Sequence, residues 1–334
     1  MNDPAPPVLL SGFADESAID KTAVQQFTAF AALGLKYYSL RFIDAGDGIK
    51  NVMALSDPEI RTVATMQSDY GLSVSSIGSP IGKVKLRDVD DGTDNRFVPF
   101  DQYLREDVAT ACDRAEAFGC KLLRGFSFYH PKDTDPADHI DQVVDQLGQI
   151  AEACDARGLT FGLEVEANLV GQTGPLLATI ADRVDHPAML TIFDGGNIVT
   201  QGFTPDETFA QYLAMKPSLG WVHIKDYHDP DPAGRIEHVD EASLDCFVPA
   251  DRGDSGHEAI LRDLRDFLPT LHDRMTSRGA AGVFLDLEPH VRGGGQFGGF
   301  SGPDGFGVAL RSLCRVLDYV GIAYALRDFD DIKA

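Results

Sequence analysis

Four acidic or imidazole side chains stand near the ends of four consecutive apolar segments in the second half of the chain. They are Glu164, Asp194, His223 and Glu288. Three carboxylates and one imidazole offer hard oxygen and nitrogen ligands, which suit Mn²⁺, Mg²⁺, Co²⁺ or Fe²⁺ better than a metal that seeks thiolates. A bound ion with two open positions can polarise a substrate carbonyl and stabilise an enediolate. We therefore expect an enzyme that holds one divalent metal ion here, with Mn²⁺ as the first expectation.

Each of these residues taken alone has an ordinary structural explanation. An acidic residue that follows a strand often caps the next helix. A histidine inside an apolar run, as His223 is within residues 219–226, is often a packed core residue. Because unpaired buried polar groups cost free energy, acidic or imidazole groups at all four positions are harder to explain by packing. The prediction of one shared site therefore depends on the four segments ending at the same place.

Those segments belong to an alternation of short apolar runs and longer amphipathic runs. The expected strands are residues 8–14, 36–41, 72–78, 121–126, 159–166, 188–194, 219–226 and 281–288. The expected helices are residues 21–33, a helix that begins near residue 56, and residues 101–118, 137–157, 175–183, 205–215, 257–278 and 303–320. Strict alternation indicates βαβ units with a parallel sheet.

Eight such units predict an α/β protein with a (β/α)8 TIM barrel, and we expect residues 1–334 to form one domain. An open, doubly wound sheet is the main alternative. Extended loops are expected after strands 3, 7 and 8, at about residues 83–100, 227–256 and 293–302. All three follow the carboxyl ends of strands, where barrel enzymes build their active sites.

Bulk composition excludes several classes of protein. The formal net charge of −23 repels phosphate backbones, so we expect no nucleic-acid partner. No apolar run reaches the roughly 18 residues of a membrane span, and the first residues lack the basic and apolar regions of a signal peptide. The five cysteines are scattered and odd in number, which favours reduced core residues. We expect a cytoplasmic protein without a membrane partner.

Charged residues near the ends of the other strands are candidates for substrate binding. They are Glu16, Arg41, Lys83, Arg124 and Lys225. Arginine or lysine inside a barrel mouth can hold an anionic group or stabilise a developing oxyanion. The alternative is a structural ion pair, such as Glu16 with Arg41. Asp226 either orients a ligand from behind or pairs with Lys225.

The motifs around these residues resemble the xylose-isomerase-like superfamily. That superfamily includes sugar phosphate isomerases and epimerases, tagatose-type ketose 3-epimerases, inosose dehydratases and endonuclease IV-like proteins. The motifs are GFADE (12–16), YSLR (38–41), SPIGK (79–83), LEVE (163–166), DGGN (194–197), VHIKD (222–226) and LEPH (287–290). The resemblance covers nearly the whole chain and implies the same four metal ligands, but it does not specify one reaction. The negative charge argues against an endonuclease.

One departure from the superfamily concerns the catalytic base. Many members carry a histidine two residues after the glutamate of strand 5, and this chain has Glu166 instead. Glu166 either replaces that histidine or lies beyond the site. His290, two residues after Glu288, is a candidate substrate contact or proton carrier.

The expected reaction is proton abstraction next to a carbonyl by Glu164 or Glu288, as in a sugar isomerase or epimerase. The resemblance also extends to large subunits of C-glycoside deglycosidases, lyases that cleave 3-oxo-glycosides by elimination with a small β-rich partner chain. A non-catalytic sugar-binding module is a further alternative. The expected partners are a sugar or glycoside and either a β-rich subunit or a second copy of this chain.

Overall fold

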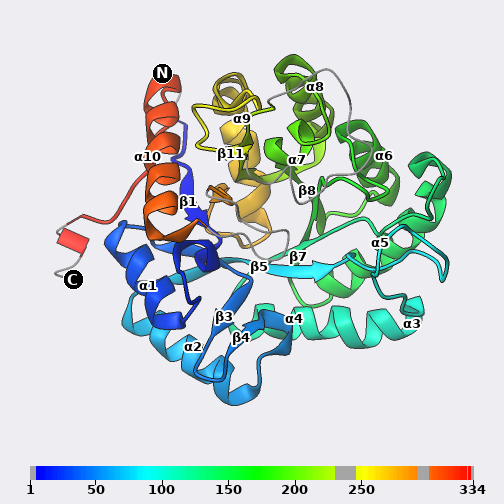
Figure 1. Ribbon diagram of the computed structural model, residues 1–334, viewed down its shortest axis with the longest axis horizontal. Helices are drawn as coiled ribbons and strands as arrows, with labels where there is room; N and C mark the ends of the chain where they lie inside the picture. The colour runs from blue at the N-terminus through cyan, green and yellow to red at the C-terminus, as the bar shows by residue number, and fades with distance from the viewer. Residues whose placement is uncertain (1–4, 230–245, 292–300, 329, 332–334) are drawn as a thin grey trace.

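Eight parallel strands form the centre of the molecule (Figure 1). The computed structural model describes residues 5–229, 246–291, 301–328 and 330–331. The strands are β1 (Leu9–Gly12), β2 (Tyr37–Leu40), β5 (Ser73–Ile81), β6 (Leu122–Gly125), β7 (Thr160–Glu164), β8 (Met189–Asp194), β9 (Leu219–Ile224) and β12 (Phe284–Leu287). They pair in the spatial order β1-β12-β9-β8-β7-β6-β5-β2. A parallel bridge between Phe13 and Ser39 links the two ends of this order, β1 and β2. The sheet is therefore a nearly closed barrel, and the predicted fold is confirmed.

Helices surround this barrel and follow one another around it in chain order (Figure 1). They are α1 (Ala23–Ala32), α2 (Asp57–Asp69), α3 (Phe100–Tyr103), α4 (Ala109–Ala117), α5 (Ile140–Asp155), α6 (Gly174–Val184), α7 (Gly195–Val199), α8 (Pro205–Met215), α9 (His257–Ser277) and α10 (Gly302–Val320). The helix expected over 101–118 is interrupted by a π-helical turn, Leu104–Val108, between α3 and α4. Within the described residues, no helix is long and apolar enough to cross a membrane.

Local sequence signals fix where several helices begin. Before α2, the hydroxyl of Ser56 and the carboxylate of Glu59 form a capping box, and proline stands at the helix start. Thr204 and Glu207 repeat that arrangement before α8. Each capping box satisfies amide groups that the first helical turn leaves without partners. The two helices therefore begin at defined residues, Asp57 and Pro205.

Two short antiparallel ribbons lie outside the barrel. Strands β3 (Phe42–Asp44) and β4 (Ile49–Asn51) form one, after β2. Strands β10 (Asp226–Tyr227) and β11 (Phe247–Val248) form the other, after β9. The single strand expected over 219–226 is therefore wrong at its end, because the chain leaves the barrel after Ile224. The extended loops expected after strands 7 and 8 lie partly outside the described residues, and the assignment of the whole chain to one domain stays a prediction.

A large aromatic side chain fills the barrel interior beneath the strand ends. Trp221 is fully buried on β9, and alternation places it on the same face of the strand as His223. Gly162 on β7 makes room for it, because a Cβ atom there would lie 2.0 Å from a carbon of the indole ring. Register pairs Ile192 with Trp221 and Asp194 with His223. The side chains at the strand ends therefore stand on a packed layer.

Candidate metal centre

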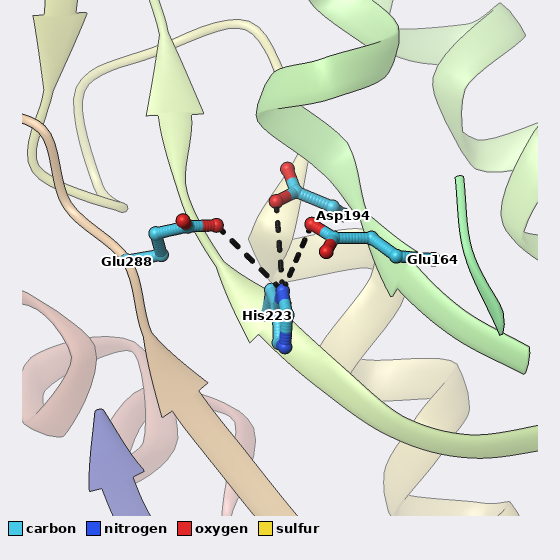
Figure 2. A group of neighbouring side chains, drawn as sticks. All are labelled: Glu164, Asp194, His223 and Glu288. Carbon is cyan, nitrogen blue, oxygen red and sulfur yellow. Dashed lines mark hydrogen bonds and ion pairs between the residues drawn. The ribbon is translucent and has the colours of Figure 1, made fainter. Parts of the chain in front are cut away.

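The four side chains predicted as metal ligands converge at the carboxyl ends of β7, β8, β9 and β12 (Figure 2). All four are buried, and one potential ligand atom from each lies within 4.8 Å of the others. The Nδ1 atom of His223 lies 3.1 Å from Oε1 of Glu164, 3.7 Å from Oε2 of Glu288 and 3.9 Å from Oδ2 of Asp194. One imidazole nitrogen therefore faces three carboxylate oxygens.

Asp194 has two roles, one for each of its oxygens. Its Oδ1 atom accepts a hydrogen bond of 2.9 Å from the backbone amide of Asn197, which makes Asp194 the N-cap of α7. Its Oδ2 atom faces His223. The capping explanation is therefore confirmed, and the ligand explanation stays a prediction that the second oxygen of the same carboxylate leaves open. The cap fixes the carboxylate plane, and with it the direction of the oxygen that points into the cluster.

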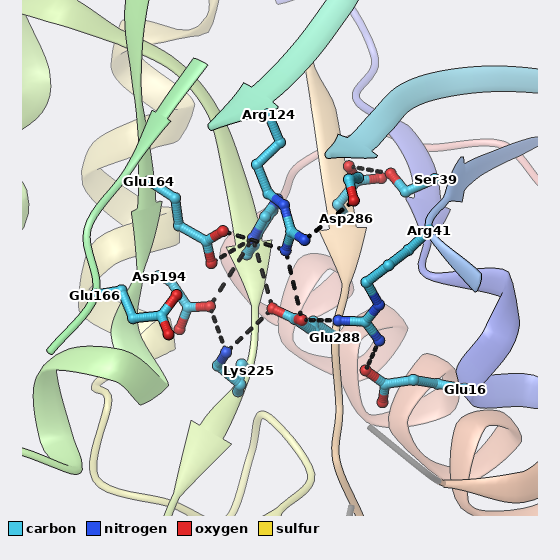
Figure 3. A network of polar contacts seen from close by, with 12 residues as sticks. Glu16, Ser39, Arg41, Arg124, Glu164, Glu166, Asp194, Lys225, Asp286 and Glu288 are labelled. Atoms are coloured by element: carbon cyan, nitrogen blue, oxygen red, sulfur yellow. Dashed lines mark hydrogen bonds and ion pairs between the residues drawn. The ribbon is translucent and has the colours of Figure 1, made fainter. Parts of the chain in front are cut away.

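Three buried cations surround the carboxylates (Figure 3). Arg124 lies 3.3 Å from Oε2 of Glu164, and Arg41 lies 2.5 Å from Oε1 of Glu288. The ammonium group of Lys225 lies 2.9 Å from Oδ2 of Asp194 and 3.1 Å from Oε2 of Glu288. The two arginines thus bind the outer oxygens of the glutamates and leave the inner oxygens facing His223.

Burial and neighbouring charges shift the carboxylate pKa values in opposite directions. Burial alone would raise the pKa of Glu164, but the adjacent His223 and Arg124 lower it to about 2. Burial raises the pKa of Asp194 to about 7; Lys225 opposes this rise, and the negative charge of Glu164 adds to it. Burial also opposes ionisation of Glu288, yet Lys225 and Arg41 hold its pKa well below the ordinary value. The raised pKa of Asp194 therefore comes mainly from burial, which the neighbouring ammonium group does not fully offset.

The donor set fits a divalent metal ion. Three carboxylates and one imidazole are the oxygen and nitrogen ligands of Mn²⁺, Mg²⁺ or Fe²⁺ sites. Oδ2 of Asp194 is buried and accepts no well-directed hydrogen bond, although the ammonium group of Lys225 is within ion-pair distance. Metal binding releases protons from its ligands, so a carboxylate that holds a proton near neutral pH can exchange it for a metal ion. Glu164, Asp194, His223 and Glu288 would hold that ion.

The remaining predicted residues form two pairs at the rim. Lys83 lies 2.8 Å from Glu166, and its ammonium group stands 4.3 Å from the centre of the Phe126 ring. Both members of this pair are partly exposed, at 30% and 26% of the side chain. Glu166 is therefore accessible at the mouth but does not belong to the four-ligand cluster.

On the opposite side, Glu16 connects the short helical turn after β1 with the end of β12. Its carboxylate lies 2.8 Å from Nδ1 of His290, accepts a 2.8 Å hydrogen bond from the His290 backbone amide, and pairs with Arg41 at 3.1 Å. The ion pair between Glu16 and Arg41 that the sequence offered as an alternative is present. His290 lies 4.0 Å from Glu288, which places it beside the cluster.

Several residues of the site were not identified from the sequence. Asp15 binds Arg41 through two nitrogens, and the ring of Phe13 contacts the guanidinium groups of both Arg41 and Arg124. Asp286 is fully buried and accepts a 2.7 Å hydrogen bond from Ser39 (Figure 3). Asp15 stands inside the GFADE motif and Asp286 inside the predicted strand 281–288, but the partner of each belongs to another part of the sheet.

Asp226 differs from both expectations, because its carboxylate accepts hydrogen bonds from the backbone amides of Tyr227, Gly253 and Ser255. It neither supports a metal ligand nor pairs with Lys225 in the structure. Asp226 instead holds the chain that follows β11. The five cysteines are free; Cys112, Cys120 and Cys154 are buried core residues, whereas Cys246 and Cys314 are partly exposed and so differ from the expectation.

An α/β barrel with buried carboxylates and an imidazole at its carboxyl end defines the class of this protein. The sequence profile of the family described as xylose isomerase-like TIM barrel matches residues 27–268. The chain belongs to that family. A search of curated proteins finds no significant match.

Solved structures of similar fold come from several organisms. One is a xylose isomerase-like TIM-barrel protein from Mycobacterium smegmatis in complex with magnesium, 20% identical, with a TM-score of 0.61 over 94% of this chain and 96% of that one. Another is the probable 3-DHS dehydratase involved in petrobactin synthesis from Bacillus anthracis, 16% identical, with a TM-score of 0.61 over 92% and 99%. A third is a D-allulose 3-epimerase from Methylomonas sp. in complex with D-allulose, 16% identical, with a TM-score of 0.55 over 93% and 98%.

Proposed function

We propose that this protein is a divalent-metal-dependent sugar isomerase or epimerase that abstracts a proton next to a carbonyl. The observation that carries the proposal is the convergence of Glu164, Asp194, His223 and Glu288 within 4.8 Å at the barrel mouth. Mn²⁺ is the expected ion, with Mg²⁺, Co²⁺ and Fe²⁺ as alternatives. The binding of magnesium and of D-allulose by proteins of similar fold supports the choice of ion class and substrate class.

The proposed proton transfer uses two carboxylates as bases. Glu164 and Glu288 enter from opposite sides of His223 (Figure 2). When bound, a divalent ion supplies a Lewis acid for a substrate carbonyl. One glutamate oxygen takes the proton from the carbon next to that carbonyl, which leaves an enediolate. Return of a proton to the opposite face of the same carbon gives the epimer, and return to the neighbouring carbon gives the isomer.

The surrounding cations keep these bases ionised and oriented. Arg124 and Arg41 each bind the outer oxygen of one glutamate, so a rotation of either carboxylate would break a buried ion pair. Glu166 is the alternative base, because it is accessible at the rim and is held by Lys83. His290 lies beside Glu288 and is the candidate to carry a proton between that carboxylate and the substrate.

Elimination is a second candidate reaction, and it starts from the same enediolate. Removal of the proton followed by loss of a group from the next carbon would make this protein a lyase, such as a C-glycoside deglycosidase large subunit. The similarity in fold to a probable dehydratase supports this candidate.

The first experiment measures metal content and solvent exchange together. The purified protein is analysed for metals, then incubated in D₂O with D-allulose and, separately, with a 3-oxo-glycoside. About one ion per chain and deuterium in the recovered ketose would support an isomerase or epimerase. Release of the aglycone would support elimination. A protein that binds the ketose without metal and without exchange would be a sugar-binding module, and the proposal would be wrong.

The test of the site uses Glu164→Gln beside Glu258→Gln. Glu164 is buried in the cluster, whereas Glu258 pairs with Arg262 on the surface of α9. We expect Glu164→Gln to lose the metal and to lower exchange by more than the roughly 100-fold that loss of an outer partner costs. The control should keep both. Full metal content and full exchange in Glu164→Gln would sink the assignment.

A further inference from the structure

Lys225 is a buried cation inside the anionic cluster. It follows His223 by two residues, which places both side chains on the same side of the chain as it leaves β9. Lys225 is only 4% exposed, although an unpaired lysine is almost never fully buried. Its ammonium group contacts one oxygen of Asp194 and one of Glu288 (Figure 3). The burial is therefore stabilised by two carboxylates that the proposed function assigns to a metal ion.

The surrounding chain is shaped to hold this lysine. Gly196, in the first turn of α7, leaves space for the aliphatic stem, because a Cβ atom there would lie 2.6 Å from Cγ of Lys225. The carbonyl oxygen of Lys225 accepts a 3.0 Å hydrogen bond from Nε2 of His257. The backbone and the stem are thus both fixed. The position of the ammonium group follows from packing as well as from charge.

The oxygens that contact Lys225 are the same ones that face the imidazole. Oδ2 of Asp194 lies 2.9 Å from the ammonium nitrogen and 3.9 Å from Nδ1 of His223. Oε2 of Glu288 lies 3.1 Å from the ammonium nitrogen and 3.7 Å from Nδ1 of His223. An ion coordinated by His223, Asp194 and Glu288 would use oxygens that already have a cationic partner.

We propose that Lys225 is the internal counter-ion of the metal site and competes with the divalent ion for Asp194 and Glu288. This inference rests on the proposed function, because it assumes the same metal site. Without a metal ion, Lys225 compensates the buried carboxylates and stabilises the folded chain. A bound divalent ion would weaken both contacts of the ammonium group, because like charges repel strongly in a buried site.

The test measures the Kd of Mn²⁺ by calorimetry on metal-stripped protein. Lys225→Met should lower the Kd by about tenfold or more, because a positive charge against two ligand oxygens is removed. Lys83→Met is the matched control: it removes an equal charge at the same mouth, but Lys83 pairs with Glu166, outside the cluster. We expect the control to change the Kd by less than about threefold. Lys225→Arg keeps the charge and should bind Mn²⁺ no more tightly than the unchanged protein.

Thermal unfolding of the same proteins gives a second readout. Lys225→Met should lower the melting temperature of the stripped protein more than that of the Mn²⁺-loaded protein, because only the stripped site needs the ammonium group. Equal Kd values for Lys225→Met and Lys83→Met, or weaker binding by Lys225→Met, would overturn the inference while the metal site stands. If neither the unchanged protein nor Lys225→Met binds Mn²⁺, the proposed metal site itself is wrong, and the inference fails with it.

Discussion

The two halves of the barrel mouth carry different kinds of charge. Strands β7, β8, β9 and β12 contribute the three carboxylates and the imidazole of the candidate metal centre. On the other side, the chain after β2 contributes Arg41 and strand β6 contributes Arg124, and both guanidinium groups contact the ring of Phe13. Each arginine forms an ion pair with a glutamate of the first half. We call the two sides the ligand half and the arginine half.

The difference between the halves separates function from stability. The ligand half gathers negative charges in a buried place; burial first, and the charges of Glu164 and Glu288 after it, raise the pKa of Asp194. Arg41 and Arg124 of the arginine half, together with Lys225 of the ligand half, supply the positive charge that makes this arrangement tolerable in a buried place. We therefore expect substitutions in the ligand half to act first on metal binding and those in the arginine half to act first on folding. Three predictions test this division.

The largest effect on stability should follow from Arg41→Met. Arg41 is buried and pairs with Asp15, Glu16 and Glu288, so its loss removes a cation that three buried carboxylates share. Breaking buried ion pairs in this way costs about 3–5 kcal/mol in the free energy of unfolding. Chemical denaturation measures that cost. Arg157→Met is the control, because Arg157 pairs with exposed carboxylates and should contribute about 0–1 kcal/mol. Equal losses in the two variants would break the division.

Glu16, which pairs with Arg41, should make the stability of the arginine half depend on pH. Burial opposes ionisation of Glu16, but His290 and Arg41 lower its pKa below the ordinary 4.5. The folded chain therefore holds fewer protons on this group than the unfolded chain does, and stability is lost as the pH falls below about 4.5. Glu16→Gln should cost about 1.5–3 kcal/mol at pH 7, as loss of a charged hydrogen-bond partner does.

Unfolding of Glu16→Gln and of the unchanged protein is followed from pH 7 down to pH 3. The stability gap between the two proteins should shrink toward the acid end, because the unchanged protein loses the contribution of the ionised carboxylate. A gap that stays constant with pH would show that Glu16 does not depend on its charge, and that the arginine half is held together by packing.

Much of the ligand half could be predicted from the sequence, because its signal is local. Alternating apolar and amphipathic runs gave eight strands in order, and ligand residues near four consecutive strand ends must meet in a closed barrel. The contacts of the arginine half are not local. Arg41 and Glu288 are far apart in the sequence, and their pairing depends on sheet register and side-chain rotamers. For the same reason, the buried contact between Asp286 and Ser39 could not be predicted from the sequence.

Errors at element ends have a similar cause. The sequence predicts one strand over residues 219–226. In the structure, Asp226 is instead the first residue of the separate ribbon, and its carboxylate accepts hydrogen bonds from backbone amides. The π-helical turn Leu104–Val108 has no glycine or proline that would mark it. Asp194 shows a further limit: sequence patterns present a helix cap and a metal ligand as alternatives, whereas a carboxylate with two oxygens can be both.

The smallest expected effect is on Mn²⁺ binding, and it concerns Asn197, a residue that supports Glu164 in the ligand half. The side-chain amide of Asn197 donates hydrogen bonds to Oε1 of Glu164 at 3.3 Å and to the backbone oxygen of Val165 at 3.1 Å. Asn197→Ala removes both, so Glu164 keeps its charge but loses part of its orientation. Loss of such an outer partner typically weakens metal binding 10- to 100-fold, and we expect about tenfold for Mn²⁺ measured by calorimetry. The control is Gln201→Ala, because the side chain of Gln201 donates its hydrogen bonds to backbone oxygens.

Asn197→Ala could instead lower the melting temperature of metal-stripped protein without changing the Kd. That result would show that Asn197 serves folding, and it would contradict the division between the halves at α7.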